Sequence, residues 1–319
     1  MVDKFEILSG VLAFVISTFG VYVYIKFNGV CLWRDDPNKP YKREVLTGGG
    51  IPVLFALTIV YVALGVKYSQ HSLFFFGLLI TTFMGSFFGF IDDVRDVKIW
   101  KKVPIMLIPP IPFVIINILN PLWNNTTVLW INWGLLYWIL IIPVVYMGFS
   151  NGANIIAGYD GLEVGIYILI LLLYIFIGII LNNSLVLHIS IPLMFALLAF
   201  ELYNLYPSKV LLGNVGSFPI GGLLGIIPFV GHFEIVLPIV FLPHLVEFLF
   251  KVKYKGHTSV FGIVDENGII RNKDGIKSVL HWLISWGNMT EKKITLAMLG
   301  IESILCIVAF FSWYIFYII

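Results

Sequence analysis

Residues 161–181 read GLEVGIYILILLLYIFIGIIL, a nearly unbroken apolar run in which Glu163 is the one charged side chain. A helix needs about 20 mostly apolar residues to cross the hydrocarbon core of a bilayer. This run is long enough to do so, and it therefore places the chain among membrane proteins.

The composition of the whole chain agrees with that placement. Of its 319 residues, 59% are hydrophobic and 12% are charged, whereas soluble domains carry about 25% charged residues. Further apolar runs between polar breaks lie at 5–27, 47–66, 71–91, 103–119, 134–151, 186–206, 214–230, 235–251 and 294–318. We therefore expect an all-α, polytopic integral membrane protein with about ten transmembrane helices.

The run at 103–119 is the weakest candidate span. Several prolines would interrupt its helical hydrogen bonding unless neighbouring helices satisfy the freed carbonyl groups. They are Pro104, Pro109, Pro110 and Pro112.

The polar breaks are too short to form a separate soluble domain, so we expect one transmembrane domain over residues 1–319. The polar residues suited to chemistry gather in a few of these breaks. They lie at 28–46, 92–103, 151–160, 207–214 and 252–293.

The positions of the basic residues orient the chain. All but two of its 20 Lys and Arg residues lie in or beside loops on one side of the expected spans, and Lys4 and Lys67 lie on the other. Basic residues are enriched in cytoplasmic loops. We therefore expect the polar loops to face the cytoplasm and both termini to lie outside it.

An acidic cluster ends the third apolar run, where residues 89–96 read GFIDDVRD. Asp92, Asp93 and Asp96 can meet on one helical turn. A divalent cation would relieve their repulsion, and oxygen ligands favour magnesium or manganese. The alternative is that these carboxylates pair with nearby lysines at a helix end, although ionisable residues at membrane depth are more often functional.

Two further segments are rich in Asn and Gly. Residues 151–163 read NGANIIAGYDGLE, in which Asn151 and Asn154 project to one side and the glycines let the backbone approach a ligand. The alternative for this segment is a turn that forms hydrogen bonds between helices. Residues 213–222 read GNVGSFPIGG, which is weak evidence alone because glycines are common at helix crossings.

Two histidines have open interpretations. His257 lies in a polar loop, where a single histidine is usually structural but could bind a ligand. His244 and Glu247 lie three residues apart in an apolar run and could pair with each other. We favour a structural role for these two residues.

Taken together and in this order, these segments resemble the polyprenyl-phosphate N-acetylhexosamine-1-phosphate transferase family, of the glycosyltransferase family 4 type. The resemblance rests on 89–93, 151–163 and 213–217 and extends over nearly the whole chain. It is closest to the eukaryotic and archaeal dolichyl-phosphate branch, as indicated by segments 154–163, 206–210, 231–233 and 290–299.

The resemblance implies a ten-helix catalytic domain with a cytoplasmic site. Its reaction would transfer GlcNAc-1-phosphate, or a related HexNAc-1-phosphate, from a UDP-sugar to dolichyl or another polyprenyl phosphate, with release of UMP. Such a reaction begins lipid-linked glycan assembly, for example in protein N-glycosylation. The implied cofactor is Mg2+, with Mn2+ as an alternative.

The implied partners are a UDP-N-acetylhexosamine, the polyprenyl phosphate and the lipid bilayer, with no nucleic acid. A homodimer is left open. We expect a prokaryotic cell membrane, archaeal because of the high Ile and Lys content, or the endoplasmic reticulum if the source is eukaryotic.

The resemblance also assigns roles to individual residues. Asp92 and Asp93 would be the catalytic carboxylates, and Asn154 and Asn214 would be magnesium ligands. Which of the two aspartates positions the lipid phosphate, takes a proton or acts as nucleophile is left open by their spacing. The expected substrate-binding residues are Lys39, Asp96, Lys102, Asn151, Gly158, Asp160 and His257.

The chain departs from the family pattern at Asn214, where the family usually has Asp. An amide oxygen is a neutral and poorer magnesium ligand. Three interpretations are open: weaker metal binding, compensation by a neighbouring carboxylate, or loss of activity. A second departure, at 255–262, lacks the basic pattern of the eukaryotic branch, so the sugar is less defined than the reaction.

The alternative function is a multi-pass transporter or channel with a cytoplasmic polar vestibule, because broken helices and buried polar groups also mark substrate pathways. Against it, the sequence has no internal repeat, and its polar groups gather at one face instead of at the midplane.

Overall fold

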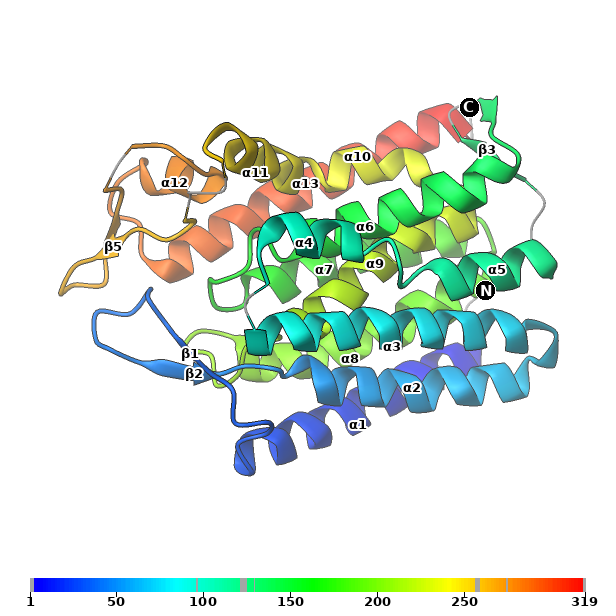
Figure 1. Cartoon of the computed structure of the whole chain (residues 1–319), viewed down its shortest axis with the longest axis horizontal. Helices are drawn as coiled ribbons and strands as arrows, with labels where there is room; N and C mark the ends of the chain where they lie inside the picture. The colour runs from blue at the N-terminus through cyan, green and yellow to red at the C-terminus, as the bar shows by residue number, and fades with distance from the viewer. Residues whose placement is uncertain are drawn as a thin grey trace.

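The computed structural model describes residues 3–95, 97–120, 125–128, 130–255, 259–273 and 275–317. The described chain is mainly helical and forms a bundle (Figure 1). Seven of its helices are long and apolar enough to cross a membrane. They are α1 (Lys4–Lys26), α2 (Gly50–Lys67), α3 (Ser72–Arg95) with the preceding 3-10 turn η1 (Ser69–His71), α7 (Leu162–Ile180), α8 (Ser184–Asn204), α9 (Asn214–Gly231) and α13 (Glu291–Tyr317). The protein is therefore a polytopic helical membrane protein.

The remaining apolar runs form shorter or broken helices. The proline-rich run divides into α4 (Ile99–Ile105) and α5 (Ile111–Leu119), as its prolines predicted. The π-helical turn η2 (Tyr137–Ile141) continues into α6 (Ile142–Ala153). Near the C-terminus, η3 (Glu234–Val236) and α10 (Leu237–Val240) lead into α11 (Leu242–Lys253) with a bend of 56°.

Helix α9 lies at the centre of the bundle and is almost completely buried, packed against α3, α6, α2, α7 and α8. Small residues allow this close packing. A Cβ atom at Gly89 of α3 would lie 2.1 Å from the backbone oxygen of Asn214. Gly89 thus lets the end of α3 touch the start of α9, which brings two of the predicted motifs together.

Short hairpins and one short helix complete the described chain. Strands β1 (Trp33–Asp35) and β2 (Glu44–Leu46) pair antiparallel, as do β3 (Thr127–Val128) with β4 (Ile131–Asn132) and β5 (Ile263–Val264) with β6 (Ile270–Arg271). Helix α12 (Val279–Ile284) follows β6.

The ends of the bundle differ in what they hold. The hairpin β1–β2, strand β5 and helix α12 lie at one end, whereas both chain termini and β3 lie at the other (Figure 1). The polar loops 28–46 and 252–293 therefore share one end, opposite the termini, which is the relative arrangement that the basic residues predict.

Candidate active site

A polar cavity of about 280 Å³ is lined in part by Arg34 of β1, and β1 lies at the end of the bundle that holds the polar loops (Figure 1). All three motifs of the sequence contribute to its wall, together with β1 and α4. Its lining includes Arg34, Asp93, Lys102, Asn154, Gly158 and Asn214. The fold thus joins residues that are far apart in the sequence into one site.

Asp93 is fixed by the start of α9. Its Oδ1 accepts a hydrogen bond from the backbone N–H of Asn214 at 3.0 Å, and its Oδ2 accepts one from Val215 at 2.9 Å. The first N–H groups of a helix have no partner within the helix and attract negative charge. The Asp93 carboxylate therefore caps α9 from the neighbouring helix α3.

Asp92 is buried beside it and accepts three hydrogen bonds. Lys102 donates to its Oδ2 at 3.0 Å, Asn214 donates to the same oxygen through Nδ2 at 2.6 Å, and the Val97 N–H donates to Oδ1 at 2.8 Å. Asp92 therefore fixes the lysine ammonium and the side chain of Asn214 at the cavity.

The residues around this point fit a divalent cation that arrives with phosphate groups. Asn154 and Asn214 line the same cavity and offer amide oxygens. The charges of Asp92 and Asp93 are balanced by Lys102, which pairs with Asp92, and by Arg34, which also lines the cavity. Since magnesium typically binds one or two carboxylates plus substrate phosphates, the missing negative charge would come from the substrate.

Gly158 and its neighbours form one wall of the cavity. Gly158 has a φ of +117°, and a Cβ atom there would lie 2.6 Å from the ring of Phe261. Its carbonyl oxygen accepts a hydrogen bond from Nδ2 of Asn38 at 2.6 Å. The adjacent Tyr159 donates its hydroxyl to the carbonyl of Val260, and burial raises the pKa of this tyrosine.

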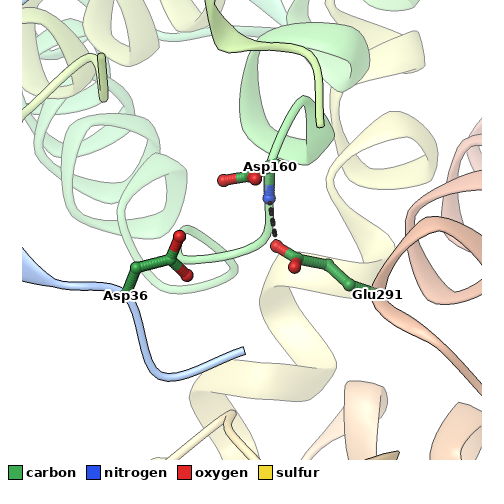
Figure 2. Close-up of side chains that lie close together, drawn as sticks. All are labelled: Asp36, Asp160 and Glu291. Carbon is green, nitrogen blue, oxygen red and sulfur yellow. Dashed lines mark hydrogen bonds between the residues drawn. The ribbon is translucent and has the colours of Figure 1, made fainter. Parts of the chain in front are cut away.

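A buried ion cluster lies directly behind this wall. The ammonium of Lys39 lies 3.1 Å from Asp36, 2.8 Å from Asp160 and 2.5 Å from Glu291. We call these four residues the Lys39 cluster. Figure 2 shows its three carboxylates converging from separate segments, with the backbone N–H of Asp160 donating to Glu291.

One carboxylate oxygen from each of Asp36, Asp160 and Glu291 lies within 4.8 Å of the other two, a grouping that could hold a metal ion. The lysine ammonium already lies among them and supplies a positive charge. Burial alone lowers the pKa of Lys39, but hydrogen bonds and charge from Asp160 and Glu291 outweigh it and raise that pKa. Lys39 and Asp160, both predicted substrate contacts, therefore lie behind the polar cavity and do not line it.

A second, mainly apolar cavity of about 710 Å³ adjoins the polar one, and Lys102 and Asn154 line both. Asn151 lines the apolar cavity and donates to the carbonyl of Met147 at 2.8 Å. The walls come mainly from α6 and α11. A further apolar cavity of about 320 Å³ shares several lining residues with it, so the apolar space continues along α6; the shared residues are Val145, Phe149, Phe241 and Leu245.

His244 also lines the apolar cavity, and its ring stacks on Phe241 with a centroid distance of 4.5 Å. Glu247 accepts a hydrogen bond from the N–H of Val279 at the start of α12. Among the described residues the two side chains do not form the pair that their spacing suggested.

Two predicted residues, Asp96 and His257, lie outside the described residues. Sequence reasoning missed Asn38, Arg34 and Glu291 as parts of the site. Arg34 donates to the backbone oxygen of Asp93 at 2.8 Å, and its signal in the sequence was only that of one basic loop residue among several. Glu291 had a faint signal as an acidic residue beside two lysines at the start of the last apolar run.

Comparison with known proteins gives consistent similarities. The glycosyl transferase family 4 profile matches residues 75–232. A proposed UDP-N-acetylglucosamine–dolichyl-phosphate N-acetylglucosaminephosphotransferase from Saccharolobus solfataricus is 27% identical over 276 residues, 86% of each chain. A protein of the same name from Sulfolobus acidocaldarius is 26% identical over 318 residues, 95% of this chain and 94% of its own. The phospho-N-acetylmuramoyl-pentapeptide-transferase of Streptococcus mutans is 28% identical over 262 residues, 76% of this chain and 77% of its own.

Proposed function

Because this chain belongs to glycosyl transferase family 4, we propose that it transfers GlcNAc-1-phosphate, or a related HexNAc-1-phosphate, from a UDP-sugar to a dolichyl-type polyprenyl phosphate and releases UMP. The names of the archaeal relatives support this substrate pair. The bacterial relative is named for a different sugar, which makes another UDP-sugar the runner-up within the same reaction. The relatives are named as transferases, so the comparisons give no support to a transporter or channel.

One observation carries the proposal: a polar cavity and an apolar cavity meet at Lys102 and Asn154. A nucleotide sugar is hydrophilic and suits the polar cavity, whereas a prenyl chain suits the apolar one. Their phosphates would then meet beside the Lys102 ammonium. A site for a soluble donor and a lipid acceptor requires this kind of junction.

The chemistry needs neutralisation of charge more than a strong base. A phosphate monoester is largely dianionic near neutral pH and is already nucleophilic. An oxygen of the lipid phosphate would bond to the sugar-bearing phosphorus, and the bond from that phosphorus to UMP would break. Lys102 would neutralise the joined phosphates, with Asp92 holding the lysine in place and Asp93 fixing the start of α9.

Asn154 and Asn214 are the residues that would hold a magnesium ion, with manganese as the alternative. When bound, the ion would supply positive charge to the pyrophosphate of the donor. Asp96 and His257 keep their proposed roles at the substrate, as an adjunct carboxylate and a sugar contact.

The proposal includes ten spans, both termini outside the cytoplasm and a site that faces it. Both chain termini lie at the end of the bundle opposite the polar loops (Figure 1). This arrangement supports placing the two termini on the same side of the membrane, across from the site. The archaeal relatives support an archaeal cell membrane.

The direct test is UMP release by the purified protein in detergent. With UDP-GlcNAc, dolichyl phosphate and Mg2+ we expect UMP and a lipid-linked sugar diphosphate, and EDTA should stop both. Parallel reactions with UDP-GalNAc, UDP-MurNAc-pentapeptide and undecaprenyl phosphate identify the substrates. Absence of product with every pair would overturn the proposal, and substrate flux in proteoliposomes without UMP would favour a transporter.

A further inference from the structure

We infer that Glu291, in the first turn of the last membrane helix, is a positioning residue for the UDP-sugar. It does not line the polar cavity, so it acts through the Lys39 cluster on the wall formed by Gly158 and Tyr159. The inference rests on the proposed function, because it assumes that this wall contacts the nucleotide sugar.

Glu291 holds the segment next to the wall through both of its carboxylate oxygens. Oε1 accepts the backbone N–H of Asp160 at 2.9 Å, and Oε2 lies 2.5 Å from Nζ of Lys39. One turn further along α13, Thr295 donates to the backbone oxygen of Asp160 at 3.2 Å. The start of α13 therefore fixes both backbone groups of Asp160, and Figure 2 shows Glu291 reaching toward it.

The segment that holds Lys39 also contacts the wall directly. Its neighbour Asn38 donates to the carbonyl oxygen of Gly158, which lines the cavity. Asp160 also accepts the N–H of Ser208 through the oxygen that binds Lys39. The cluster thus joins four segments at the back of the cavity: the loop after β1, the turn before α7, the loop before α9, and α13.

The stoichiometry of hydrogen bonds explains why a carboxylate is needed at 291. A lysine ammonium has three N–H donors, and the side chain of Lys39 is fully buried with an acceptor from each of Asp36, Asp160 and Glu291. A Gln at 291 could still accept from Asp160, but its NH2 group would face the ammonium. The substitution therefore removes the charged contact and keeps the length of the side chain.

The test separates donor affinity from turnover. We expect Glu291→Gln to raise KM for UDP-GlcNAc by about tenfold, with kcat and KM for the lipid phosphate changed less than about twofold. Glu291→Asp keeps the charge but shortens the side chain by one methylene group, so it should raise the same KM by a smaller factor of about threefold. Glu266→Gln is the matched control, because Glu266 is exposed at the turn between β5 and β6.

Binding of UDP-GlcNAc by calorimetry, with no lipid acceptor, gives a readout independent of turnover. A Glu291→Gln protein with wild-type affinity and KM would overturn the inference, and so would equal losses for donor and lipid. If Glu291→Gln does not fold, an unchanged donor KM in Glu291→Asp would also overturn it. A wild-type protein that binds UDP-GlcNAc but forms no UMP contradicts the proposed function instead, and the binding comparison then still decides the role of Glu291.

Discussion

The side-chain amide of Asn214 donates to Oδ2 of Asp92 across 2.6 Å, although 122 residues separate the two along the chain. The same oxygen accepts from Lys102 at 3.0 Å. An aspartate at 214 could not donate this hydrogen bond and would add a third carboxylate beside Asp92 and Asp93. Two carboxylates, Asp92 and Asp93, thus lie beside the neutral Asn214, as the interpretation of compensation by a neighbouring carboxylate requires.

Asn214→Asp should therefore bind metal more tightly and be less stable without it. We expect the Mg2+ concentration for half-maximal activity to fall by about tenfold, since a carboxylate is a stronger ligand than an amide. The Tm measured in EDTA should fall as well, because the hydrogen bond to Asp92 becomes a repulsion. Asn132→Asp, exposed on β4, is the control; an unchanged Mg2+ dependence would contradict the metal role of residue 214.

Asp93→Asn should abolish UMP release, with kcat reduced by at least about a hundredfold. The neutral amide has one oxygen for the two N–H groups at the start of α9, and it removes negative charge from the cavity. Initial rates at saturating substrates measure the effect. Asp35→Asn, on an exposed position of β1, should keep wild-type rates; activity near wild type in the Asp93 variant would remove Asp93 from the catalytic group.

Gly148→Leu should block the apolar cavity. Gly148 lines it, and a Cβ atom there would have no other atom within 4 Å, so the leucine can enter without displacing the backbone. We expect KM for the lipid phosphate to rise by roughly fivefold or more while KM for the UDP-sugar stays constant.

The control for this variant is Gly300→Leu on the exposed side of α13, where an added Cβ is equally free of contacts. It matches the change in size and helix propensity. If both variants behave alike, or if Gly148→Leu affects only the UDP-sugar, the apolar cavity is not the lipid site.

Lys39→Met should destabilise the protein by about 3–5 kcal/mol, because it leaves three buried carboxylates without their shared cation. Thermal unfolding in detergent measures the loss. Lys42→Met, an exposed position in the same loop, should have little effect. A comparable Tm for the two variants would show that the Lys39 cluster contributes little to stability.

The pH dependence of Lys39→Met has a defined sign. In the wild type, the raised pKa of Lys39 stabilises the fold below the unfolded value of about 10.4, and this stabilisation is lost only as pH rises through the higher folded value. Lys39 therefore adds no pH dependence between pH 5 and 9. Without the lysine, repulsion between the neighbouring carboxylates favours their protonated forms. Because protons are more available at pH 5 than at pH 8, the loss of Tm should be larger at pH 8.

Much of the architecture could be predicted because hydropathy is local. The run at 161–181 forms α7, the prolines after Lys102 break their run into α4 and α5, and the basic loops lie opposite the chain ends. The motifs at 89–93, 151–163 and 213–217 also lie at one cavity, as the resemblance implied. Local pattern did not predict the 56° bend before α11.

The sequence by itself thus determined the helical membrane class and the residue types available to the site. Only the tertiary structure decided which of them meet. The approach of α3 to α9 at Gly89 sets Asp92 against Asn214, and the docking of α13 sets Glu291 against Asp160, 131 residues earlier in the chain. Such contacts depend on how distant helices pack, and hydrophobic period and charge count within a segment hold no information about that packing.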